Sequence, residues 1–221
     1  MFKMKIEYVD GANYQIDMIH HHMKNTMWED GLKTVYPVPE SDPYSLKKNS
    51  QCRCNLKAVF NALDNNSEFL AFTYARESTE PMITKTKVGG YYRPHFDAAD
   101  CGHFSTTIFL NDPQTYDGGE LCLMIDNEER KFKLDPGYGI TYETGTSHCV
   151  NDVTRGERNV MIFWTVSMIR DMNDLHKWRY YDILSERHHE KNPTDQSLFD
   201  FQNSLYAHFR EKSNKIVRKY L

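Results

Sequence analysis

The sequence predicts a mainly β protein with flanking helices, for two reasons. Between about residues 82 and 170, short apolar runs rich in Thr, Ile, Val, Phe and Tyr alternate with turn clusters, which is typical of an all-β sandwich or barrel. On either side of this segment, apolar residues recur at helical spacing. The 221 residues are 39% hydrophobic and 13% aromatic, which is enough apolar material for one domain with a buried core.

The first 80 residues are expected to be mainly helical and to form an N-terminal support region. The clearest helical stretches are 13–28 and 55–72, and three prolines between them predict a loop. Asn55 is a suitable N-cap for the second stretch. The apolar residues behind it share one helical face at positions i, i+3, i+4 and i+7: Leu56, Val59, Phe60 and Leu63.

The predicted β core spans residues 81–171. Its turns contain clusters of Gly, Pro, Asn and Asp, which adopt the preset or positive φ angles that tight turns need. The expected strands are 82–88, 104–110, 120–125, 130–134, 138–143, 147–152 and 158–168.

After the core, residues 172–221 are expected to form a C-terminal helical extension. The two predicted helices, 171–188 and 196–219, are separated by a short segment that contains Asn and Pro. We expect helices from both ends of the chain to buttress the β core, so that the three regions form one globular unit.

Charge and hydropathy argue against two classes of partner. The net charge of −4 and the pI near 6.2 disfavour nucleic-acid binding, which usually needs a cationic surplus. The basic residues between 208 and 219 fit the solvated face of a terminal helix. The mean hydropathy is −0.71, and no apolar run approaches the ~20 residues of a membrane span. Charged residues near the start of the sequence disfavour a secretory signal peptide.

The five cysteines are Cys52, Cys54, Cys101, Cys122 and Cys149. An odd number without a C-x-x-C pair favours a reducing compartment, and hence a cytoplasmic protein, over a disulfide scaffold. Cys52 and Cys54 could supply half of a metal site, but without a second pair we expect them to be buried thiols.

His95-Phe96-Asp97 is the first candidate for chemistry. Residues i and i+2 of a strand point to the same side, so His95 and Asp97 can face one point. About one such H-x-D triplet is expected by chance in a chain of this composition, so the triplet means little alone. With His148 it forms the two-histidine, one-carboxylate set of non-haem Fe(II) oxygenases, which leaves positions open for a bidentate 2-oxo acid and dioxygen. Arg158, ten residues beyond His148, could hold the distal carboxylate of such an acid.

Five ordered segments resemble a known family: VGGYYRPHFDAA, FSTTIFLND, YDGGELCL, KLDPGYGITYE and SHCVNDVTRGERNVMIFWTVSMIRD. They are similar to the Fe(II)/2-oxoglutarate-dependent dioxygenases of the prolyl/lysyl hydroxylase type, including prolyl 4-hydroxylases, and most of all to the bacterial PKHD-type hydroxylases. The resemblance covers residues 82–171 and, more loosely, the flanking helices. It implies a double-stranded β-helix (jelly-roll) core with the iron at its open end.

By position, the resemblance makes His95, Asp97 and His148 the iron ligands and Arg158 the basic residue that binds 2-oxoglutarate. Collagen-type relatives usually have lysine at the last position, and either cation can pair with a carboxylate. Apolar residues along the last strand are expected to keep the pocket dry: Val160, Ile162 and Trp164.

Two further cosubstrate contacts are expected. Ser105 falls where relatives place a hydroxyl near the distal carboxylate. Tyr92 is the second candidate, although its cluster with Tyr91 and Arg93 is equally consistent with a substrate platform or with tyrosine packing. Nine residues before the first ligand, many prolyl hydroxylases carry a tyrosine that helps to hold the cosubstrate, and this chain has Thr86 there.

The implied activity is hydroxylation of a C–H bond that uses Fe(II), 2-oxoglutarate and O2, releases succinate and CO2, and takes ascorbate as a reductant. The expected substrate is a prolyl or other residue of a peptide or protein. Alternatives are the same chemistry on a free small-molecule metabolite or a nucleobase, or a non-catalytic jelly-roll binding protein. The acidic balance disfavours a nucleobase, and the presence of all four site residues disfavours a non-catalytic relative. A zinc hydrolase would need a general base beside the ligands.

Other polar groups are expected to be structural. The runs His20–His22 and His188–His189 fit solvated faces, because consecutive helical residues point in different directions. His103 is expected to be a hydrogen-bonded structural residue rather than part of the substrate mouth. Arg155, in the turn before the last strand, should point away from the cosubstrate, and Cys149 should point away from the metal.

Overall fold

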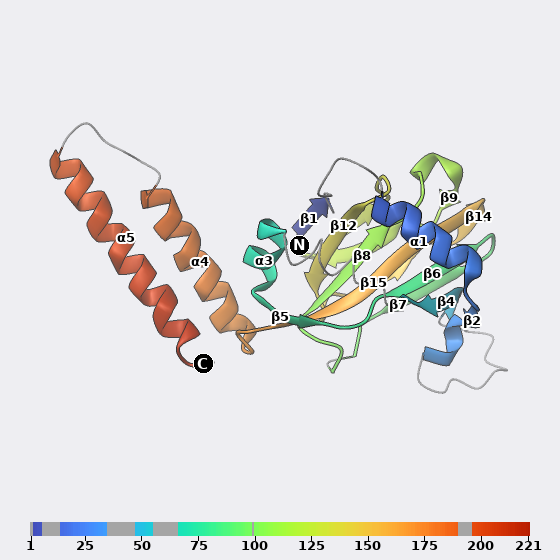
Figure 1. The fold of residues 1–221 in the computed structure, drawn as a ribbon, viewed down its shortest axis with the longest axis horizontal. Coiled ribbons are helices and arrows are strands. Elements are labelled where there is room, and N and C mark those ends of the chain that lie inside the picture. Colours follow the sequence, from blue (N-terminus) through green and yellow to red (C-terminus); the bar gives the residue numbers. More distant parts are fainter. Residues whose placement is uncertain (1, 6–13, 35–46, 55–65, 99, 190–195) are drawn as a thin grey trace.

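A computed structural model shows a β sandwich with one helix across an outer face and two at one end (Figure 1). It describes residues 2–5, 14–34, 47–54, 66–98, 100–189 and 196–221. The strands are β1 (Phe2–Lys5), β2 (Glu29–Asp30), β3 (Lys47–Lys48), β4 (Ser50–Arg53), β5 (Ala75–Ser78), β6 (Met82–Lys87), β7 (Tyr91–His95), β8 (Phe104–Phe109), β9 (Asp117–Gly118), β10 (Leu121–Ile125), β11 (Glu128–Phe132), β12 (Tyr138–Glu143), β13 (His148–Val150), β14 (Val153–Arg155) and β15 (Glu157–Ser167). The helices are α1 (Tyr14–Asn25), α3 (Ser67–Thr73), α4 (Met172–His189) and α5 (Gln196–Val217), with 3-10 turns η1 (Gly31–Thr34) and η2 (Pro113–Thr115).

Two antiparallel sheets form the sandwich. The larger sheet has the order β1-β12-β8-β15-β6-β4-β2, with β5 also paired to β15. The smaller sheet has the order β11-β10-β13-β7-β3, and β14 pairs with β9 beside it. The long strand β15 pairs with β8 and with β6, so it lies at the centre of the larger sheet. This architecture confirms the predicted mainly β fold with a jelly-roll core.

Most predicted core strands are present. The structure confirms β6, β8, β10, β12, β13 and β15 close to their expected bounds. β11 begins at Glu128 rather than at residue 130. β7 was not among the predicted runs, because its sequence YYRPH contains Arg93 and Pro94 and its residues are only half-buried or exposed, so it lacks the apolar alternation of a core strand.

Apolar side chains from both sheets fill the space between them. Phe109 and Val160 of the larger sheet share a buried cluster with Leu121 and Leu123 of the smaller sheet. A fully buried side chain of this size contributes about 1.5–3 kcal/mol. The cluster therefore sets the distance between the two sheets and leaves their open end for the site.

The helix α1 covers the outer face of the larger sheet (Figure 1). Its Ile16, Ile19 and Met23 recur at helical spacing and are buried against the sheet, in a cluster that includes Ile83 and Phe163. One apolar stripe on α1 is therefore enough to dock it, as expected for the predicted stretch 13–28.

The prediction that residues 1–80 are mainly helical was wrong for the described part of this region, which also contains β1 to β5. Each of these strands has two to four residues and is completed by pairing with another strand, such as β1 with β12, so no local pattern reveals it. The helix α3 begins after Asn66, whose side chain accepts a hydrogen bond from the Phe69 N–H at 2.8 Å. The expected cap Asn55 lies outside the described residues.

The helices α4 and α5 confirm the predicted C-terminal helices and form a hairpin that extends from one end of the sandwich (Figure 1). The base of the hairpin is anchored where Leu175, Trp178 and Ile216 pack with Phe104 and Ile169. The far end lies away from both sheets, so the expected buttressing of the core by the C-terminal helices is confined to this base. The division into 1–80, 81–171 and 172–221 stays a prediction.

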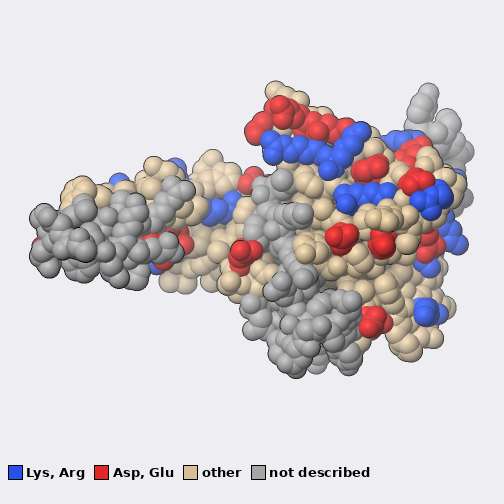
Figure 2. Space-filling model, turned by 90° about the horizontal axis from the view of Figure 1, so that it is seen from above, with Lys and Arg blue, Asp and Glu red and all other residues tan. Residues whose placement is uncertain are grey.

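Charges of both signs are mixed on the face shown in Figure 2, where the described Lys and Arg side chains lie beside Asp and Glu side chains. Such mixing is typical of a solvated protein surface. Of the described helices, none combines the length and the apolar composition that crossing a bilayer requires.

Candidate active site

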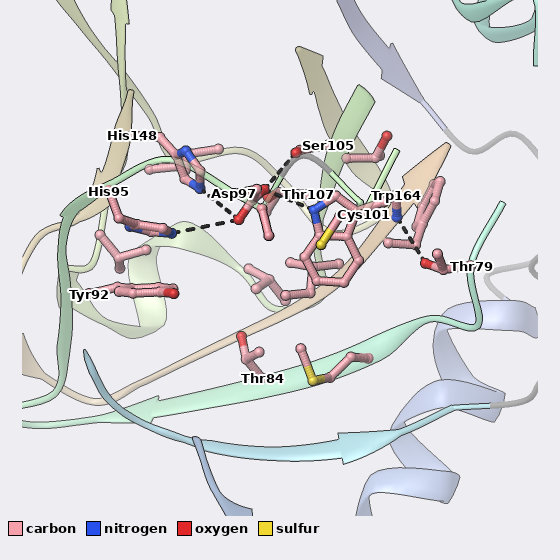
Figure 3. Close-up of a pocket in the computed structure, with 18 of the residues that line it drawn as sticks. Thr79, Thr84, Tyr92, His95, Asp97, Cys101, Ser105, Thr107, His148 and Trp164 are labelled. Carbon is pink, nitrogen blue, oxygen red and sulfur yellow. Dashed lines mark hydrogen bonds and ion pairs between the residues drawn. The ribbon is translucent and has the colours of Figure 1, made fainter. Parts of the chain in front are cut away.

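The three predicted metal ligands meet at one end of the smaller sheet. His95 ends β7 and His148 begins β13, and the two residues are directly opposite each other. Asp97 follows β7 and turns its Oδ1 between them, 3.7 Å from His95 Nε2 and 3.6 Å from His148 Nε2 (Figure 3). One ligand atom from each residue lies within 4.8 Å of the others. Strand register thus brings distant parts of the sequence into one cluster of three ligands.

Both histidines direct Nε2 at this point. The Nδ1–H of His95 donates to the Arg93 carbonyl at 2.8 Å, and that of His148 donates to the Thr146 carbonyl at 2.9 Å. Because a carbonyl only accepts, each Nδ1 carries the proton and each Nε2 presents its lone pair. Among the described residues, the buried Nε2 of His95 lacks a hydrogen-bond partner. Burial and the neighbouring His148 lower the pKa of His95 to about 4, and a neutral imidazole is what a metal requires.

Two strands of the larger sheet hold the Asp97 carboxylate. Its Oδ2 accepts hydrogen bonds from Ser105 Oγ at 2.6 Å and from Trp164 Nε1 at 2.8 Å (Figure 3). Ser105 and Trp164 are paired across β8 and β15. Because both donors engage Oδ2, Oδ1 is left to face the histidines and to bind a metal through one oxygen. Two imidazoles that direct Nε2 at one point and one oriented carboxylate fit Fe(II) as bound by non-haem oxygenases.

A cavity of about 610 Å³ opens beside the three ligands, within the usual range for small-molecule sites. Its wall includes Arg158 of β15, which is 2% exposed. Within the described part of the chain, the Arg158 Nε has no hydrogen-bond partner. Burial lowers the pKa of Arg158 to about 10, so the guanidinium stays charged at neutral pH. A buried cation at a cavity wall complements an anionic guest such as a carboxylate.

The structure shows which side chains lie next to each expected cosubstrate contact. Thr86 of β6 is buried directly opposite Arg158, so a small side chain occupies the position where many prolyl hydroxylases have tyrosine. Ser105 donates to Asp97, and its contact with the cosubstrate stays a prediction. The Tyr92 ring stacks on His95 with centroids 3.5 Å apart, and burial raises the pKa of Tyr92 to about 12. The neutral phenol ring of Tyr92 therefore packs against His95, one of the proposed metal ligands.

Tyr142 and Lys47 are among the residues of the cavity wall that sequence reasoning missed. Tyr142 of β12 is buried with its ring 5.2 Å from the His148 ring; its place on a predicted strand was a usable signal, because alternate residues of a strand face the core. Lys47 of β3 is 3% exposed, and its Nζ lies 5.0 Å from the centre of the Tyr92 ring. Burial lowers the pKa of Lys47 to about 8. A two-residue strand offers no periodicity, so nothing local pointed to Lys47.

The expected apolar wall is confirmed by the cavity lining, which includes Val160, Ile162 and Trp164.

Two residues expected to lie outside the chemistry do so. His103 accepts a hydrogen bond from the Ser167 N–H at 3.0 Å and donates to the Arg170 carbonyl at 3.0 Å, which confirms a structural role. Arg155 forms two hydrogen bonds with Asp117, at 2.7 and 3.0 Å, on the exposed surface. Of these two arginines, Arg158 lines the cavity and Arg155 does not.

The histidine run of α1 differs from the expected solvated face. His20 donates to the Leu110 carbonyl at 2.8 Å, and His22 donates to the Arg53 carbonyl at 2.9 Å. Each is half-buried at the junction of α1 and the sheet, and the two have different partners, so His20 and His22 have a packing role, whereas His21 is exposed as expected. The side chains of His188–His189 lie outside the described residues.

Comparison with known proteins agrees with this geometry. Residues 81–166 match the family model described as the 2OG-Fe(II) oxygenase superfamily. A PKHD-type hydroxylase of Prochlorococcus marinus (strain NATL2A) is 32% identical over 154 residues, which cover 66% of this chain and 70% of that protein. The PKHD-type hydroxylase YbiX of Escherichia coli (strain 55989 / EAEC) is 36% identical over 122 residues, 51% of this chain and 54% of that protein.

Two solved structures share the fold. A prolyl hydroxylase from Trichoplax adhaerens, in complex with a peptide fragment of the hypoxia inducible factor oxygen degradation domain, has a TM-score of 0.61 and 11% identity, covering 75% of this chain and 83% of its own. A Pseudomonas putida prolyl-4-hydroxylase has a TM-score of 0.55 and 17% identity, covering 75% of this chain and 91% of its own.

Proposed function

The chain belongs to the 2OG-Fe(II) oxygenases of the PKHD and prolyl 4-hydroxylase type, and from this premise we propose that it hydroxylates a prolyl residue of a peptide or protein. It is a 2-oxoglutarate-dependent dioxygenase. In our proposal His95, Asp97 and His148 hold Fe(II), and Arg158 binds the distal carboxylate of 2-oxoglutarate.

One observation carries the assignment of the site: the Oδ1 of Asp97 lies 3.7 and 3.6 Å from the Nε2 atoms of His95 and His148 at the wall of a cavity that also contains the buried Arg158. When bound there, the iron supplies activation of O2 coupled to decarboxylation of 2-oxoglutarate, with succinate and CO2 as coproducts.

The protein side chains have separate tasks in this proposal. Arg158 pairs with the far carboxylate, so that the other end of the 2-oxo acid reaches the metal. Tyr142 and the apolar wall exclude water from the space between the two ends. Ser105 and Trp164 keep the Asp97 carboxylate turned toward the histidines.

The rim of the cavity supports a peptide substrate. Phe96 lies between two of the proposed ligands in the sequence, lines the cavity and is 66% exposed. An exposed aromatic ring beside a reaction centre provides a flat apolar surface on which a pyrrolidine ring can pack. The solved prolyl hydroxylase with a bound peptide shares this fold. We further propose that the enzyme uses ascorbate as a reductant and that it is cytoplasmic. The division of the chain into the regions 1–80, 81–171 and 172–221 is also part of the proposal.

Anaerobic titration tests the site. A visible charge-transfer band should form only when Fe(II) and 2-oxoglutarate are both present. It should be lost in His148→Ala and kept in His103→Ala, which removes a structural histidine. No band in the wild-type protein would overturn the assignment of the site.

The substrate needs a separate measurement. Incubation with a library of proline peptides, followed by mass spectrometry, should reveal a product heavier by one oxygen atom, together with succinate. If a free metabolite stimulates succinate release and no peptide does, the prolyl assignment is wrong and the small-molecule alternative replaces it.

A further inference from the structure

A second group of metal-binding side chains lies in the smaller sheet, outside the cavity. The Sγ atoms of Cys122 and Cys149 and a carboxylate oxygen of Glu129 lie within 4.8 Å of one another. They come from β10, β13 and β11, which are adjacent strands. Three neighbouring strands therefore contribute one potential ligand each.

This group faces away from the proposed iron site. Cys149 lies between His148 and Val150, which both line the cavity, and Cys122 lies between Leu121 and Leu123, which are both in the buried core. Because successive side chains of a strand point to opposite faces, the two cysteines lie on the outer face of the smaller sheet. This confirms that Cys149 points away from the proposed metal ligand beside it.

The strand register favours a bridging ion over a disulfide. Cys122 and Cys149 are directly opposite each other. Two residues away on either side, the Met124 N–H donates to the Ser147 carbonyl and the Asn151 N–H donates to the Glu120 carbonyl. Because hydrogen-bonded and non-hydrogen-bonded pairs alternate along an antiparallel ladder, Cys122 and Cys149 also form a hydrogen-bonded pair. The Cβ atoms of such pairs are about 5.5 Å apart, whereas a disulfide needs about 3.5–4.5 Å. A metal ion between the sulfurs spans this distance without moving the strands together.

Two thiolates and a carboxylate are a donor set that Zn²⁺ accepts, with sulfur at about 2.3 Å and oxygen at about 2.0–2.2 Å. In a tetrahedral site the two sulfurs lie about 3.8 Å apart, which small side-chain rotations can reach from the observed cluster. On binding, the two thiols release two protons, and a water molecule completes the fourth position.

Charge and access also suit a cation with three anionic ligands. Lys131 is directly opposite Cys122 on β11, and its Nζ lies 3.2 Å from the Glu129 carboxylate. Two thiolates, one carboxylate and Zn²⁺ sum to one negative charge, which Lys131 balances. Cys122 is 2% exposed and Cys149 is half-buried, while Glu129 is exposed. The site is closed on the side of the sheet and reachable from solvent.

We propose that Cys122, Cys149 and Glu129 form a Zn²⁺ site that ties β10, β11 and β13 together, independent of the proposed iron site. Because β13 carries Cys149 and His148 on opposite faces, the ion would stiffen the strand that presents His148 to the cavity.

Cobalt titration of the full-length chain tests the site. The background is His95→Ala, which removes one of the three ligands of the histidine–carboxylate cluster but leaves the outer face intact. We expect one Co²⁺ per chain and a thiolate-to-cobalt charge-transfer band in the near ultraviolet. Cys122→Ser and Cys149→Ser should abolish the band, and Glu129→Gln should weaken binding about tenfold or more. The matched control Cys101→Ser should keep it.

A second measurement needs no variant of the cluster. Zn²⁺ should protect Cys122 and Cys149 of the wild-type protein from alkylation, as mapped by mass spectrometry, and leave Cys101 reactive. Equal alkylation with and without Zn²⁺, absence of the thiolate band, or ready oxidation of the pair to a disulfide would each overturn the zinc site. A thiolate band in His95→Ala that persists while iron binding is lost would show that the two sites are separate.

Discussion

Replacing Trp164 by phenylalanine should weaken Fe(II) binding although the side chain is not a proposed ligand. The indole Nε1 donates to Asp97 Oδ2 at 2.8 Å, beside the Ser105 hydroxyl at 2.6 Å. Phenylalanine keeps most of the ring and removes only the donor. The carboxylate then loses one of the two hydrogen bonds that orient Oδ1 toward the histidines.

The magnitude follows from the charge on the acceptor. A hydrogen bond to an ionised group contributes about 1.5–3 kcal/mol. Each 1.4 kcal/mol is tenfold in an equilibrium constant, so loss of this bond should raise the Kd for Fe(II) about 10- to 100-fold, the range found for residues that orient metal ligands. Ser105→Ala removes the companion bond and should act in the same direction.

Anaerobic Fe(II) titration measures the effect, with Mn²⁺ calorimetry as a readout that does not depend on turnover. The matched control is Trp178→Phe, in the base of the C-terminal hairpin, which should bind Fe(II) like the wild type. If Trp164→Phe binds Fe(II) as tightly as the control, the hydrogen bond does not position Asp97 and the reasoning fails.

Three further predictions test the cavity and the fold. Arg158→Gln should raise the KM for 2-oxoglutarate by about 30-fold or more in steady-state assays, since loss of one partner of a buried charged pair costs about 2 kcal/mol or more. Burial holds the pKa of Lys47 at about 8, below its ordinary 10.5; the unfolded chain then binds the extra proton between these values, so stability should rise with pH across that window. Lys47→Met should remove this rise and stabilise the protein at pH 7 by up to ~3 kcal/mol in denaturant titrations. Gly118 has φ +72°, and a Cβ at this position would lie against the Asp152 carbonyl oxygen. Gly118→Ala should therefore lower the free energy of unfolding by about 2 kcal/mol, seen as a lower melting temperature. Gly145→Ala, with open space around it, should melt like the wild type.

Each of these has an outcome that counts against it. An unchanged KM in Arg158→Gln would remove this residue from the cosubstrate site. Equal pH dependence of unfolding in the wild type and Lys47→Met would mean that the ammonium group is solvated in the folded state. Equal melting temperatures for Gly118→Ala and Gly145→Ala would mean that the turn can relax.

The β core was predictable because its information is local. The short runs rich in Thr, Ile, Val, Phe and Tyr, with turn clusters between them, located β6, β8, β12 and β15, since β-branched and aromatic residues favour strands and tight turns require particular residues. The short strands β1 to β4 were not predictable in this way. They have few residues, and they form because a neighbouring strand offers unpaired backbone groups to them.

The residues of the candidate site also divide into those that the sequence predicted and those that it did not. His95, Asp97, His148 and Arg158 were found from residue type, spacing and resemblance, because the chemistry of a metal and a carboxylate admits few side chains. Lys47 was not found, because its burial depends on the pairing of β3 with β7.

Sequence alone was sufficient to predict the fold class, from residue type and short-range pattern, and to propose the metal ligands and the cosubstrate cation, from residue type, spacing and family resemblance. The folded chain decided which partners those residues have: the two donors on Asp97, the stacking of Tyr92 on His95, and the meeting of Cys122 with Cys149. These contacts join strands that are distant in sequence. Their geometry is set by register and by the packing of two sheets, and no local segment carries that information.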